Sequence, residues 1–432
     1  FYRWFADGEI NICDCCLDQQ VLAGRGEQAA LIYDSPVTGT VSTYTYHSLL
    51  QTVSHFAGGL VQAGIKKGDT VVIYMPMLPQ AVIAMLACAR IGAVHSVVFG
   101  GFAPHELAMR IDDAMPKAII SATYGIEFNN RIAYTPLVEK ALAEATHKPS
   151  LHICFRRDKE PIAPGTTDFN ELLEAPSAAV VPMLSGDPLY VLYTSGTTGK
   201  PKGILRDHGG YATALRFSME KVYDAHAGDV FWAASDVGWV VGHSYIVYGP
   251  LLQGCTSVLY EGKPVRTPDP GAFWRVISQH RVNVMFTAPT AIRAIRKEDP
   301  DGKLTSAYAI SSLRCLFLAG ERCDPPTYHW IREQLQVPVI DHWWQTESGW
   351  PMVGIMMGVE QLEPRAGSAG LPVCGFDLHI LSENGEVLEH GAEGYIALRL
   401  PLPPGCLPTL WNNDARFIAG YLVHFPGYYQ TG

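Results

Sequence analysis

The sequence predicts an α/β protein built around a mostly parallel sheet with helices on both faces. The first observation is a repeated order of short apolar run, Gly or Pro break and helical pattern along much of the 432 residues, which is typical of β-α-β units. The second is the composition, 48% hydrophobic and 17% charged, which suffices for one large core or several fused lobes. The third is a change of texture after about residue 365, where short alternating strands and Gly-rich turns indicate a small antiparallel or barrel-like unit.

The first predicted strands are TVVIYMP (70–76), AVHSVVFGGF (93–102) and AIISAT (118–123), and helical patterns over 80–92 and 105–114 separate them. Apolar runs of the same kind return in the second half of the chain. They lie at 229–235, 256–260, 283–289 and 312–320, with helical patterns at 272–282 and 327–335. The later, shorter strands are FDLHIL (376–381) and EGYIALRL (393–400).

These patterns divide the chain into three expected parts. Residues from about 1 to 185 form a first α/β lobe, and those from about 186 to 364 a second α/β lobe. Residues from about 365 to 432 form the small β unit. The stretch 156–187 between the two lobes is rich in Pro, Ala, Glu and Asp and is predicted to lie on the surface.

Charge and hydropathy exclude several classes of partner. The formal net charge is −10 and no Lys- or Arg-rich stripe appears, so a nucleic-acid partner is not expected. The longest apolar region is interrupted by Pro76, Pro79, Gln80 and Arg90, so no membrane span is expected either. Ten mostly isolated cysteines favour a reducing compartment, the cytoplasm or the mitochondrial matrix. A small anionic ligand stays possible, because a local cluster of donors can oppose the overall charge.

The stretch YVLYTSGTTGKPKG (190–203) is the most informative in the chain. YVLY predicts a buried strand, and the ten residues after it form a loop that Pro201 keeps from being helical. Its glycines let backbone N–H groups approach an anion, and its hydroxyl and lysine side chains add donors and charge. Two residues between Gly196 and Gly199, and Pro201 after Lys200, exclude the ordinary P-loop. The loop is therefore suited to a polyphosphate, and a flexible Gly/Ser linker is the weaker alternative.

On these ten residues the chain resembles the adenylate-forming family of acyl-CoA synthetases, peptide-synthetase adenylation domains and luciferases. Further segments are similar to the acetyl- and propionyl-CoA synthetase branch of that family, so the resemblance covers nearly the whole chain. They are DVGWVVGHSYIVYGPL (236–251), FTAPTAIRAIR (286–296), LAGERCDP (318–325), DHWWQTESG (341–349) and FPGYYQTG (425–432). The resemblance implies two stacked, mostly parallel sheets with flanking helices, and a small β-barrel-like subdomain.

The resemblance implies an ATP-dependent acid–thiol ligase. A short-chain carboxylate would attack the α-phosphorus of ATP and release pyrophosphate, and the thiol of CoA would then displace AMP from the acyl-adenylate. ATP, CoA and Mg²⁺ are the expected cosubstrates and cofactor, with only small-molecule partners. Positioning and charge neutralisation dominate such phosphoryl chemistry.

The family pattern assigns nucleotide roles to two motifs. In the loop, Thr194, Lys200 and Lys202 would act on the phosphates, and Ser195, Gly196, Thr197, Thr198 and Gly199 would bind them. In the second motif, Thr346 would contact the α-phosphate and Glu347 would hold Mg²⁺, because a hard cation prefers carboxylate oxygen. Trp344 and Gln345 complete that ATP set. The expected adenine contacts are Gly320, Glu321 and Arg322 with Asp341, His342 and Trp343, although the family often has proline in place of Arg322.

CoA and the acyl group have their own candidates. Phe99, Gly100 and Gly101 match a CoA nucleotide contact, with a strand-ending turn as the alternative. Arg131 is a further CoA candidate, although IEFNNR departs from the family pattern. The acyl pocket would have Trp344 as its floor and Val240, Val241 and Ala319 as its walls. Alanine in place of a family valine leaves room for one more carbon, so propionate is expected over acetate; repacking without a change of specificity is the alternative.

The family pattern continues beyond the YYQTG sequence with a ribose-binding aspartate and a small domain that contains an adenylating lysine. We therefore expect residues 1–432 to be the large N-terminal domain, which binds ATP and acyl-adenylate but turns over slowly or not at all by itself. The alternatives are an acetyl-CoA synthetase and a catalytically silent module that binds a nucleotide or an acyl-adenylate. The tryptophan floor disfavours a luciferase-like oxygenase.

Overall fold

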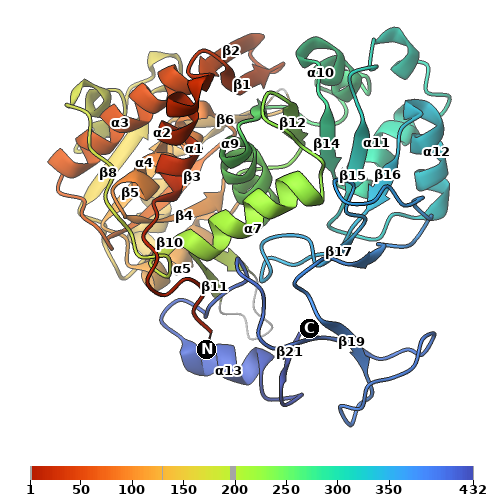
Figure 1. The fold of residues 1–432 in the computed structure, drawn as a ribbon. Coiled ribbons are helices and arrows are strands. Elements are labelled where there is room, and N and C mark those ends of the chain that lie inside the picture. Colours follow the sequence, from red (N-terminus) through yellow and green to blue (C-terminus); the bar gives the residue numbers. More distant parts are fainter. Residues whose placement is uncertain (1, 129, 195–200, 432) are drawn as a thin grey trace.

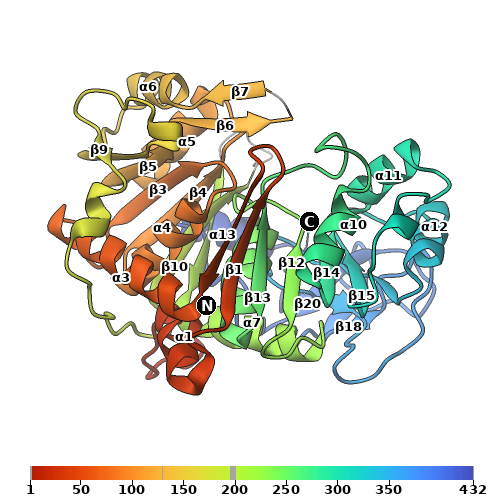
Figure 2. The same cartoon turned by 90° about the horizontal axis from the view of Figure 1, so that it is seen from above.

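In a computed structural model, which describes residues 2–128, 130–194 and 201–431, the chain forms two seven-stranded sheets and a smaller β unit (Figures 1 and 2). Each large sheet is parallel except for one antiparallel edge strand. The α/β class with mostly parallel sheets is thus confirmed. Three hydrophobic clusters, one between the sheets and one on the outer face of each, explain why the strands are apolar on both faces.

The first sheet has the order β16-β15-β14-β12-β13-β1-β2, with β2 as its antiparallel edge. Its parallel strands end near one another, so the residues after them meet at one edge of the sheet. The strands are β1 (Ala29–Ser35), β2 (Thr40–Thr45), β12 (Val230–Ala233), β13 (Thr256–Tyr260), β14 (Val284–Thr287), β15 (Cys315–Leu318) and β16 (Val339–Asp341).

The second sheet has the order β11-β10-β4-β3-β5-β8-β9, with β11 as its antiparallel edge. Its strands are β3 (Thr70–Met75), β4 (Val94–Phe99), β5 (Ala118–Ala122), β8 (Leu151–Phe155), β9 (Thr167–Asp168), β10 (Pro188–Thr194) and β11 (Lys202–Asp207). A separate hairpin of β6 (Tyr124–Glu127) and β7 (Asn130–Ala133) follows β5.

Helices cover both faces of each sheet. The outer face of the first sheet packs on α10 (Ala272–His280), α11 (Pro289–Glu298) and α12 (Pro325–Leu335). The outer face of the second packs on α5 (Pro104–Ala114) and α6 (Thr135–Glu144). The helices between the sheets are α1 (Ile12–Cys16), α3 (Tyr46–Gln62), α4 (Pro79–Arg90), α7 (His208–Lys221), α8 (Val240–Gly242), η4 (His243–Tyr248) and α9 (Gly249–Gln253). Short helical turns are α2 (Asp18–Gln20), η1 (Val21–Arg25), η2 (Arg157–Lys159), η3 (Glu171–Glu174) and η5 (Thr305–Ala307).

Alternate residues of each strand enter different clusters. In β3, Val71 and Ile73 face the core between the sheets, whereas Val72 and Tyr74 face the helices outside. The period of two follows from the pleat of a strand. Burial on both faces explains why the sequence of such strands is a continuous apolar run rather than an alternation.

The chain crosses between the two sheets. β1 and β2, near the N-terminus, belong to the sheet of β12–β16, and β10 and β11 belong to the sheet of β3–β5. The expected lobe boundary near residue 186 is therefore not a boundary between sheets. The three-part division of the chain remains a prediction.

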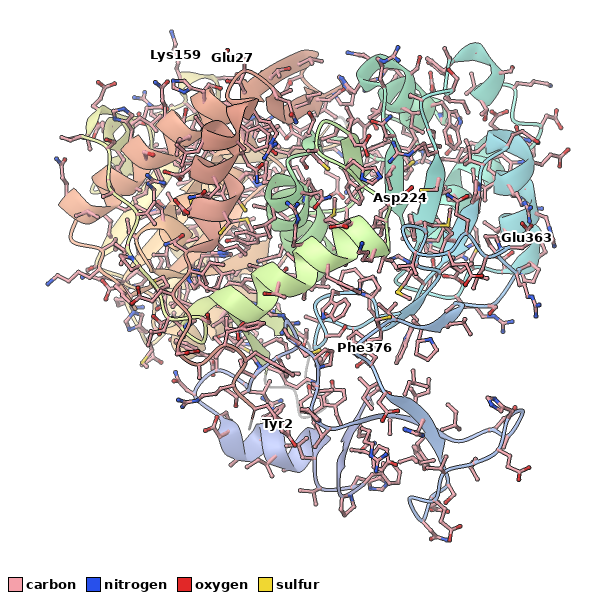
Figure 3. The ribbon with its side chains drawn as sticks, viewed as in Figure 1. Tyr2, Glu27, Lys159, Asp224, Glu363 and Phe376 are labelled. Atoms are coloured by element: carbon pink, nitrogen blue, oxygen red, sulfur yellow. The ribbon has the colours of Figure 1, made fainter. Side chains whose placement is uncertain are left out.

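The C-terminal part is a smaller β unit below the two sheets in Figure 1. It contains the antiparallel sheet β19 (Leu378–Leu381), β20 (Tyr395–Arg399) and β21 (Tyr428–Gln430), the pair β17 (Val353–Gly354) and β18 (Leu371–Pro372), and α13 (Asp414–Tyr421). The antiparallel strands agree with the expectation, whereas α13 was not expected. Phe376, labelled in Figure 3, packs at 4.6 Å from Trp350 and connects this unit to the main body.

A buried ion pair joins the two sheets. Arg157, which follows β8, donates from Nη1 and Nη2 to the two oxygens of Glu261, which follows β13, at 2.7 Å each. Tyr33 and Ser35 of β1 also donate to Glu261 Oε2, at 2.5 and 2.8 Å. The side chains of Arg157 and Glu261 are only 7% and 5% exposed. All four groups satisfy one another, so removing the cation leaves a buried carboxylate without its charge partner.

We expect Arg157→Met to destabilise the protein by about 3–5 kcal/mol, because Glu261 stays buried and loses its cation. The neighbouring Arg156→Met is the matched control, since the Arg156 side chain is 39% exposed and lies 3.5 Å from Asp168. It should cost less than about 1 kcal/mol. Thermal unfolding of the three proteins at one scan rate measures the difference, and equal unfolding temperatures for the two variants would contradict it.

Candidate active site

The phosphate-loop stretch connects the two strands of a hairpin. Thr194 ends β10, Lys202 begins β11, and the two residues are paired across the antiparallel ladder. Ser195, Gly196, Thr197, Thr198, Gly199 and Lys200 lie outside the described residues. The Thr194 hydroxyl is buried and has no hydrogen-bond partner in the described part of the chain. Such a group is available to a ligand at the start of the loop.

Lys202 and Glu347 are brought together, although 145 positions separate them in the sequence. Lys202 Nζ lies 3.3 Å from Glu347 Oε1. Tyr421, at the end of α13, donates to the same oxygen at 2.7 Å and accepts from Lys202 at 2.8 Å. Burial, and next the negative charge of Glu347, raise the pKa of the Tyr421 phenol, which therefore keeps its proton. The sequence interpretation included Lys202 and Glu347 but missed Tyr421.

A buried arginine lies beneath the second motif. Arg206 is completely buried and donates to the backbone oxygens of Thr346 and of Leu205, the latter at 3.1 Å. No carboxylate of the described residues lies within ion-pair distance of it, and its Nε has no partner there. Gly349 makes room for it, because a Cβ at that position would lie 2.7 Å from Arg206 Nε. The guanidinium thus fixes the Thr346 backbone and adds positive charge below the site.

The expected adenine contacts come from two neighbouring loops. Gly320, Glu321 and Arg322 follow β15 and are exposed, while Asp341 ends the adjacent strand β16. Asp341 Oδ2 accepts from the Cys323 N–H at 3.1 Å and ties the loops together. Burial raises the pKa of the Asp341 carboxyl. Glu321 pairs with Arg293 of α11 at 2.5 Å, so its side chain is already engaged.

His342 is buried and hydrogen-bonded on both ring nitrogens. Nδ1 lies 2.7 Å from the Leu318 oxygen and Nε2 lies 2.9 Å from the Tyr223 hydroxyl. Burial lowers the pKa of His342 to about 4, so the imidazole is neutral at pH 7. It holds the end of β16 rather than supplying charge. Trp343 is partly buried and bonds through its backbone to Val353 of β17.

The expected acyl-pocket residues pack against the core between the sheets. Ala319 is buried, and Val240, Val241 and Trp344 are partly buried on the same cluster. Trp344 meets Tyr245 edge-on at 5.6 Å and Phe286 at 6.1 Å. Tyr245 belongs to η4, which directly follows the α8 turn that contains Val240 and Val241. Gln345 is engaged by its side chain with the backbone oxygen of Thr431.

A cavity of about 650 Å³ opens at the carboxyl ends of β4, β12 and β13. Phe99, Gly100 and Gly101 line it, as do Trp239 and Thr287. A Cβ on Gly100 would lie 2.2 Å from the Tyr134 hydroxyl, so only glycine fits there. Phe99 packs on Trp239 with ring centroids 5.3 Å apart. Three of the four expected CoA residues therefore lie at one cavity.

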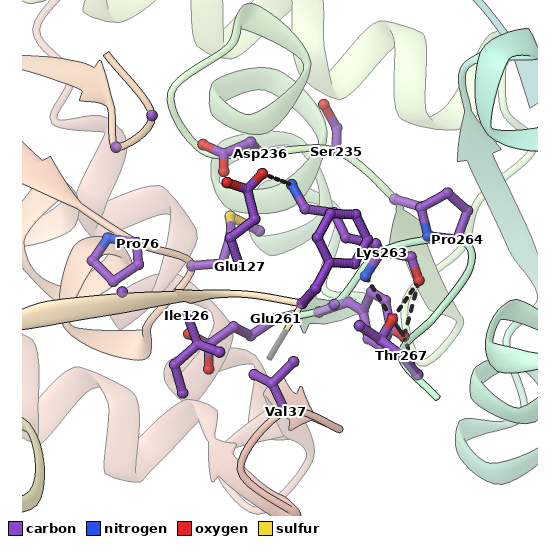
Figure 4. A pocket seen from close by; sticks show the side chains of 18 of the residues that line it. Val37, Pro76, Ile126, Glu127, Ser235, Asp236, Glu261, Lys263, Pro264 and Thr267 are labelled. Carbon is purple, nitrogen blue, oxygen red and sulfur yellow. Dashed lines mark hydrogen bonds and ion pairs between the residues drawn. The ribbon is translucent and has the colours of Figure 1, made fainter. Parts of the chain in front are cut away.

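The cavity has charged groups that the sequence interpretation did not single out. Figure 4 shows Glu127 and Lys263 facing each other, with Nζ and Oε1 3.6 Å apart, and Asp236 nearby. Burial raises the pKa of Asp236 to about 6, although its Oδ1 accepts from the Gly238 N–H at 2.8 Å. Asp236 stands in the quoted DVGW segment, which was the available signal. Nothing local in the sequence marks Glu127 or Lys263, because Glu127 ends β6 of the separate hairpin whereas Lys263 follows β13 of the first sheet.

The fourth expected CoA residue does not line this cavity. Arg131 lies on β7 with its guanidinium 3.6 Å from the centre of the Tyr124 ring, and it pairs with Glu160. Its side chain is 48% exposed. Arg131 belongs to the β6–β7 hairpin, and other residues of that hairpin, Gly125, Ile126 and Glu127, do line the cavity.

The fold and this arrangement of nucleotide motifs define the AMP-binding enzymes. Residues 17–403 match that family, described as "AMP-binding enzyme", and the chain belongs to it. The acetoacetyl-CoA synthetase from Streptomyces lividans has the same fold, with a TM-score of 0.92 at 24% identity over 100% of this chain and 66% of that one.

Relatives of higher identity cover almost all of this chain. An uncharacterized protein of Pseudomonas aeruginosa is 56% identical over 100% of this chain and 69% of its own length. The human mitochondrial acyl-CoA synthetase short-chain family member 3 is 52% identical over 99% of this chain and 63% of its own. The propionate–CoA ligase of Salmonella typhimurium is 44% identical over 98% and 68%. The chain thus spans about two thirds of the length of these relatives.

Two further findings concern the described residues alone. None of their helices combines the length and apolar character that a bilayer span needs. They also contain no group of three or more His, Cys, Asp or Glu side chains arranged to hold a metal ion.

We expect Gly349→Ala to weaken ATP binding at least about tenfold, because the added Cβ displaces Arg206 from the Thr346 carbonyl. Gly391→Ala is the control, since Gly391 has a similar φ of +89° against +77° but open space around it. Both variants lose about 1–2 kcal/mol of stability from the left-handed backbone. Calorimetric titration with ATP separates them, and equal affinities would show that Arg206 does not support the site.

Proposed function

We propose that this chain is the adenylating part of an ATP-dependent short-chain acyl-CoA ligase. A carboxylate oxygen attacks the α-phosphorus of ATP, the bond to the bridging oxygen breaks, and pyrophosphate leaves. The CoA thiol, after losing its proton, then attacks the acyl carbon and AMP departs. The names of the human and Salmonella relatives, a short-chain acyl-CoA synthetase and a propionate–CoA ligase, agree with this reaction.

The observation on which the proposal rests is the convergence of Lys202 and Glu347 at the mouth of the β10–β11 hairpin. A lysine ammonium and a carboxylate 3.3 Å apart supply, in one place, a phosphate ligand and an oxygen ligand for a cation. The buried charge of Arg206 adds attraction for a polyphosphate. Thr346 and the unpartnered hydroxyl of Thr194 would donate hydrogen bonds to the phosphates. Preorganised donors of this kind are the main source of rate in phosphoryl transfer.

The donor set also fits Mg²⁺ as the expected metal. Mg²⁺ is commonly held by one or two carboxylates together with substrate phosphates and water. Glu347 is one such carboxylate, and the described residues offer no cage made only of protein ligands. When bound, the ion would neutralise charge on the phosphates. Glu347 would hold it, while Lys202 orients the phosphate oxygens.

The cavity lined by Phe99, Gly100 and Gly101 is the proposed entry for CoA. Ser235, Asp236 and Trp239 line it, and the acyl-pocket candidates Val240 and Val241 follow directly in the chain, which supports this proposal. Arg131 is a CoA contact only if it leaves Glu160, since the two side chains are paired. Lys263 faces the cavity and would attract the CoA phosphates, although it too has a carboxylate nearby, Glu127 at 3.6 Å.

Propionate is the proposed acid, because Ala319 leaves more space than a valine would. One methylene is worth about 1–3 kcal/mol of discrimination, so acetate remains a slower substrate. An acetyl-CoA synthetase and a silent adenylate-binding module are the competing proposals. The cytoplasm or the mitochondrial matrix is the proposed compartment, and the name of the human relative includes the word mitochondrial.

The test is a calorimetric titration with the propyl and ethyl phosphate esters of AMP, which occupy the AMP site and acyl pocket together. We expect the propyl ester to bind at least about tenfold more tightly. Ala319→Val should reverse or abolish that preference, because two added methyl groups narrow the wall. Affinity for AMP itself should stay within about twofold, since the change lies outside the nucleotide contacts.

If the unmodified chain binds the two esters with equal affinity, acetate rather than propionate would be the assigned substrate. Binding of both esters together with AMP, but no reaction of the complete protein with CoA and either acid, would favour the silent module. Absence of any AMP or ester binding would contradict the proposal as a whole.

A further inference from the structure

Tyr421 stands at the centre of the Lys202–Glu347 pair but belongs to the C-terminal unit, outside the residues that match the family. Its hydroxyl donates to Glu347 Oε1 at 2.7 Å and accepts from Lys202 Nζ at 2.8 Å. Both contacts are shorter than the direct distance of 3.3 Å between Lys202 and Glu347. The phenol therefore contacts each charged group more closely than the two charged groups contact each other.

Packing fixes the ring in this place. The Tyr421 ring stacks on Tyr429 with centroids 5.3 Å apart and planes within 8°, and Phe417 packs at 5.7 Å on the same helix. Tyr421 is 7% exposed and Tyr429 2%. A buried, stacked ring presents its hydroxyl in one direction, so its two hydrogen bonds are preorganised.

The segment before Tyr421 is tied to the outgoing strand of the phosphate hairpin. The Trp411 N–H donates to the Gly203 oxygen at 2.8 Å, and Leu410 bridges Ile204. Arg416 of α13 donates to the Pro201 oxygen at 2.9 Å. Figure 1 shows α13 below β11, in agreement with these contacts. The C-terminal unit thus holds the exit of the loop in register with Tyr421.

Only one carboxylate oxygen of Glu347 is engaged. Oε1 takes the contacts from Tyr421 and Lys202, whereas Oε2 accepts no hydrogen bond from the described residues. The Glu347 backbone is also held, since its oxygen accepts from the Leu407 N–H at 2.9 Å. This arrangement leaves Oε2 without a hydrogen-bond partner among the described residues, while Lys202 and Tyr421 are both directed to Oε1.

We propose that Tyr421 is a positioning residue that fixes Lys202 and Glu347 in a three-way contact at Glu347 Oε1, so that Glu347 Oε2 stays available to a divalent cation and the Lys202 ammonium to phosphate. The inference rests on the proposed function and adds a residue to it. Without the phenol oxygen, the Lys202 ammonium would lose an acceptor, and its 3.3 Å contact with Glu347 would tighten and extend over both carboxylate oxygens. A magnesium ion would then have to displace the lysine before it bound.

The experiment measures ATP binding without any carboxylate present, by calorimetry, first in EDTA and then over a series of Mg²⁺ concentrations. For Tyr421→Phe we expect the EDTA affinity to stay within about twofold and the Mg²⁺ concentration for half-maximal tightening to rise about tenfold, which corresponds to one hydrogen bond to a charged group. Tyr429→Phe is the matched control. It removes a buried hydroxyl that has no partner in the described residues, from the ring stacked on Tyr421, and should change neither value.

A Tyr421→Phe protein with an unchanged Mg²⁺ requirement would overturn the inference, as would an equal loss of affinity with and without Mg²⁺, which a merely structural role predicts. If that variant does not fold, Asn413→Ala replaces it. The Asn413 side chain caps α13 by accepting from the Arg416 N–H at 3.0 Å, so its loss loosens the helix and should raise the Mg²⁺ requirement two- to threefold. An unmodified chain that binds no ATP in either buffer would instead overturn the proposed function.

Discussion

The burial of both faces of the two parallel sheets determines where in the fold the site can lie. Helices and the opposite sheet cover the strands, so polar groups have access to a ligand mainly where the strands end. The candidate residues obey this rule. Thr194 ends β10, Phe99 ends β4, Asp236 follows β12, Ala319 follows β15 and Asp341 ends β16. Nucleotide, acyl and CoA candidates from distant parts of the chain meet at the carboxyl edges because the strands are parallel, and the turn after each strand is free to vary.

Two positively charged side chains also contribute to this site. The protein has a net charge of −10, yet Lys202 lies at the hairpin and Arg206 is buried behind it without a carboxylate partner among the described residues. Interactions with a buried charge are screened less than those at the surface, so such a guanidinium attracts a phosphate more strongly than an exposed lysine does at the same distance. The overall charge therefore argues against nucleic acid without arguing against ATP. Buried pairs that are satisfied, such as Arg157 with Glu261, contribute to joining the sheets instead.

The sequence predicted what depends on local pattern. Continuous apolar runs predicted β3, β4, β5, β12, β14 and β15, and YVLY predicted β10. The hairpin was not predicted, because the expected loop extended to residue 203 whereas β11 begins at Lys202. The resemblance supplied the candidates at the strand ends. Of these, Lys202 and Glu347 form an ion pair, and Phe99, Gly100 and Gly101 line one cavity. The resemblance did not predict how strands are shared between sheets, since β1 lies beside β13 through pairing over more than 200 positions. Arg131 looked like a phosphate ligand by residue type, but Glu160 and the Tyr124 ring are nearer partners for it.

The site features that the sequence did not predict have one physical property in common. Tyr421, Arg206 and the Glu127–Lys263 pair act through single side-chain contacts between elements far apart in the chain, and no periodicity or motif accompanies such a contact. The strength of each depends on burial, because a hydrogen bond to a charge is worth more where water cannot replace it. The C-terminal unit illustrates the consequence. By sequence it is an appendage of short strands, yet through α13 it touches both Pro201 and Lys202. A movement of this unit would therefore change the distance between a phosphate ligand and a metal ligand, and the geometry of the site depends on how the small unit packs on the large one.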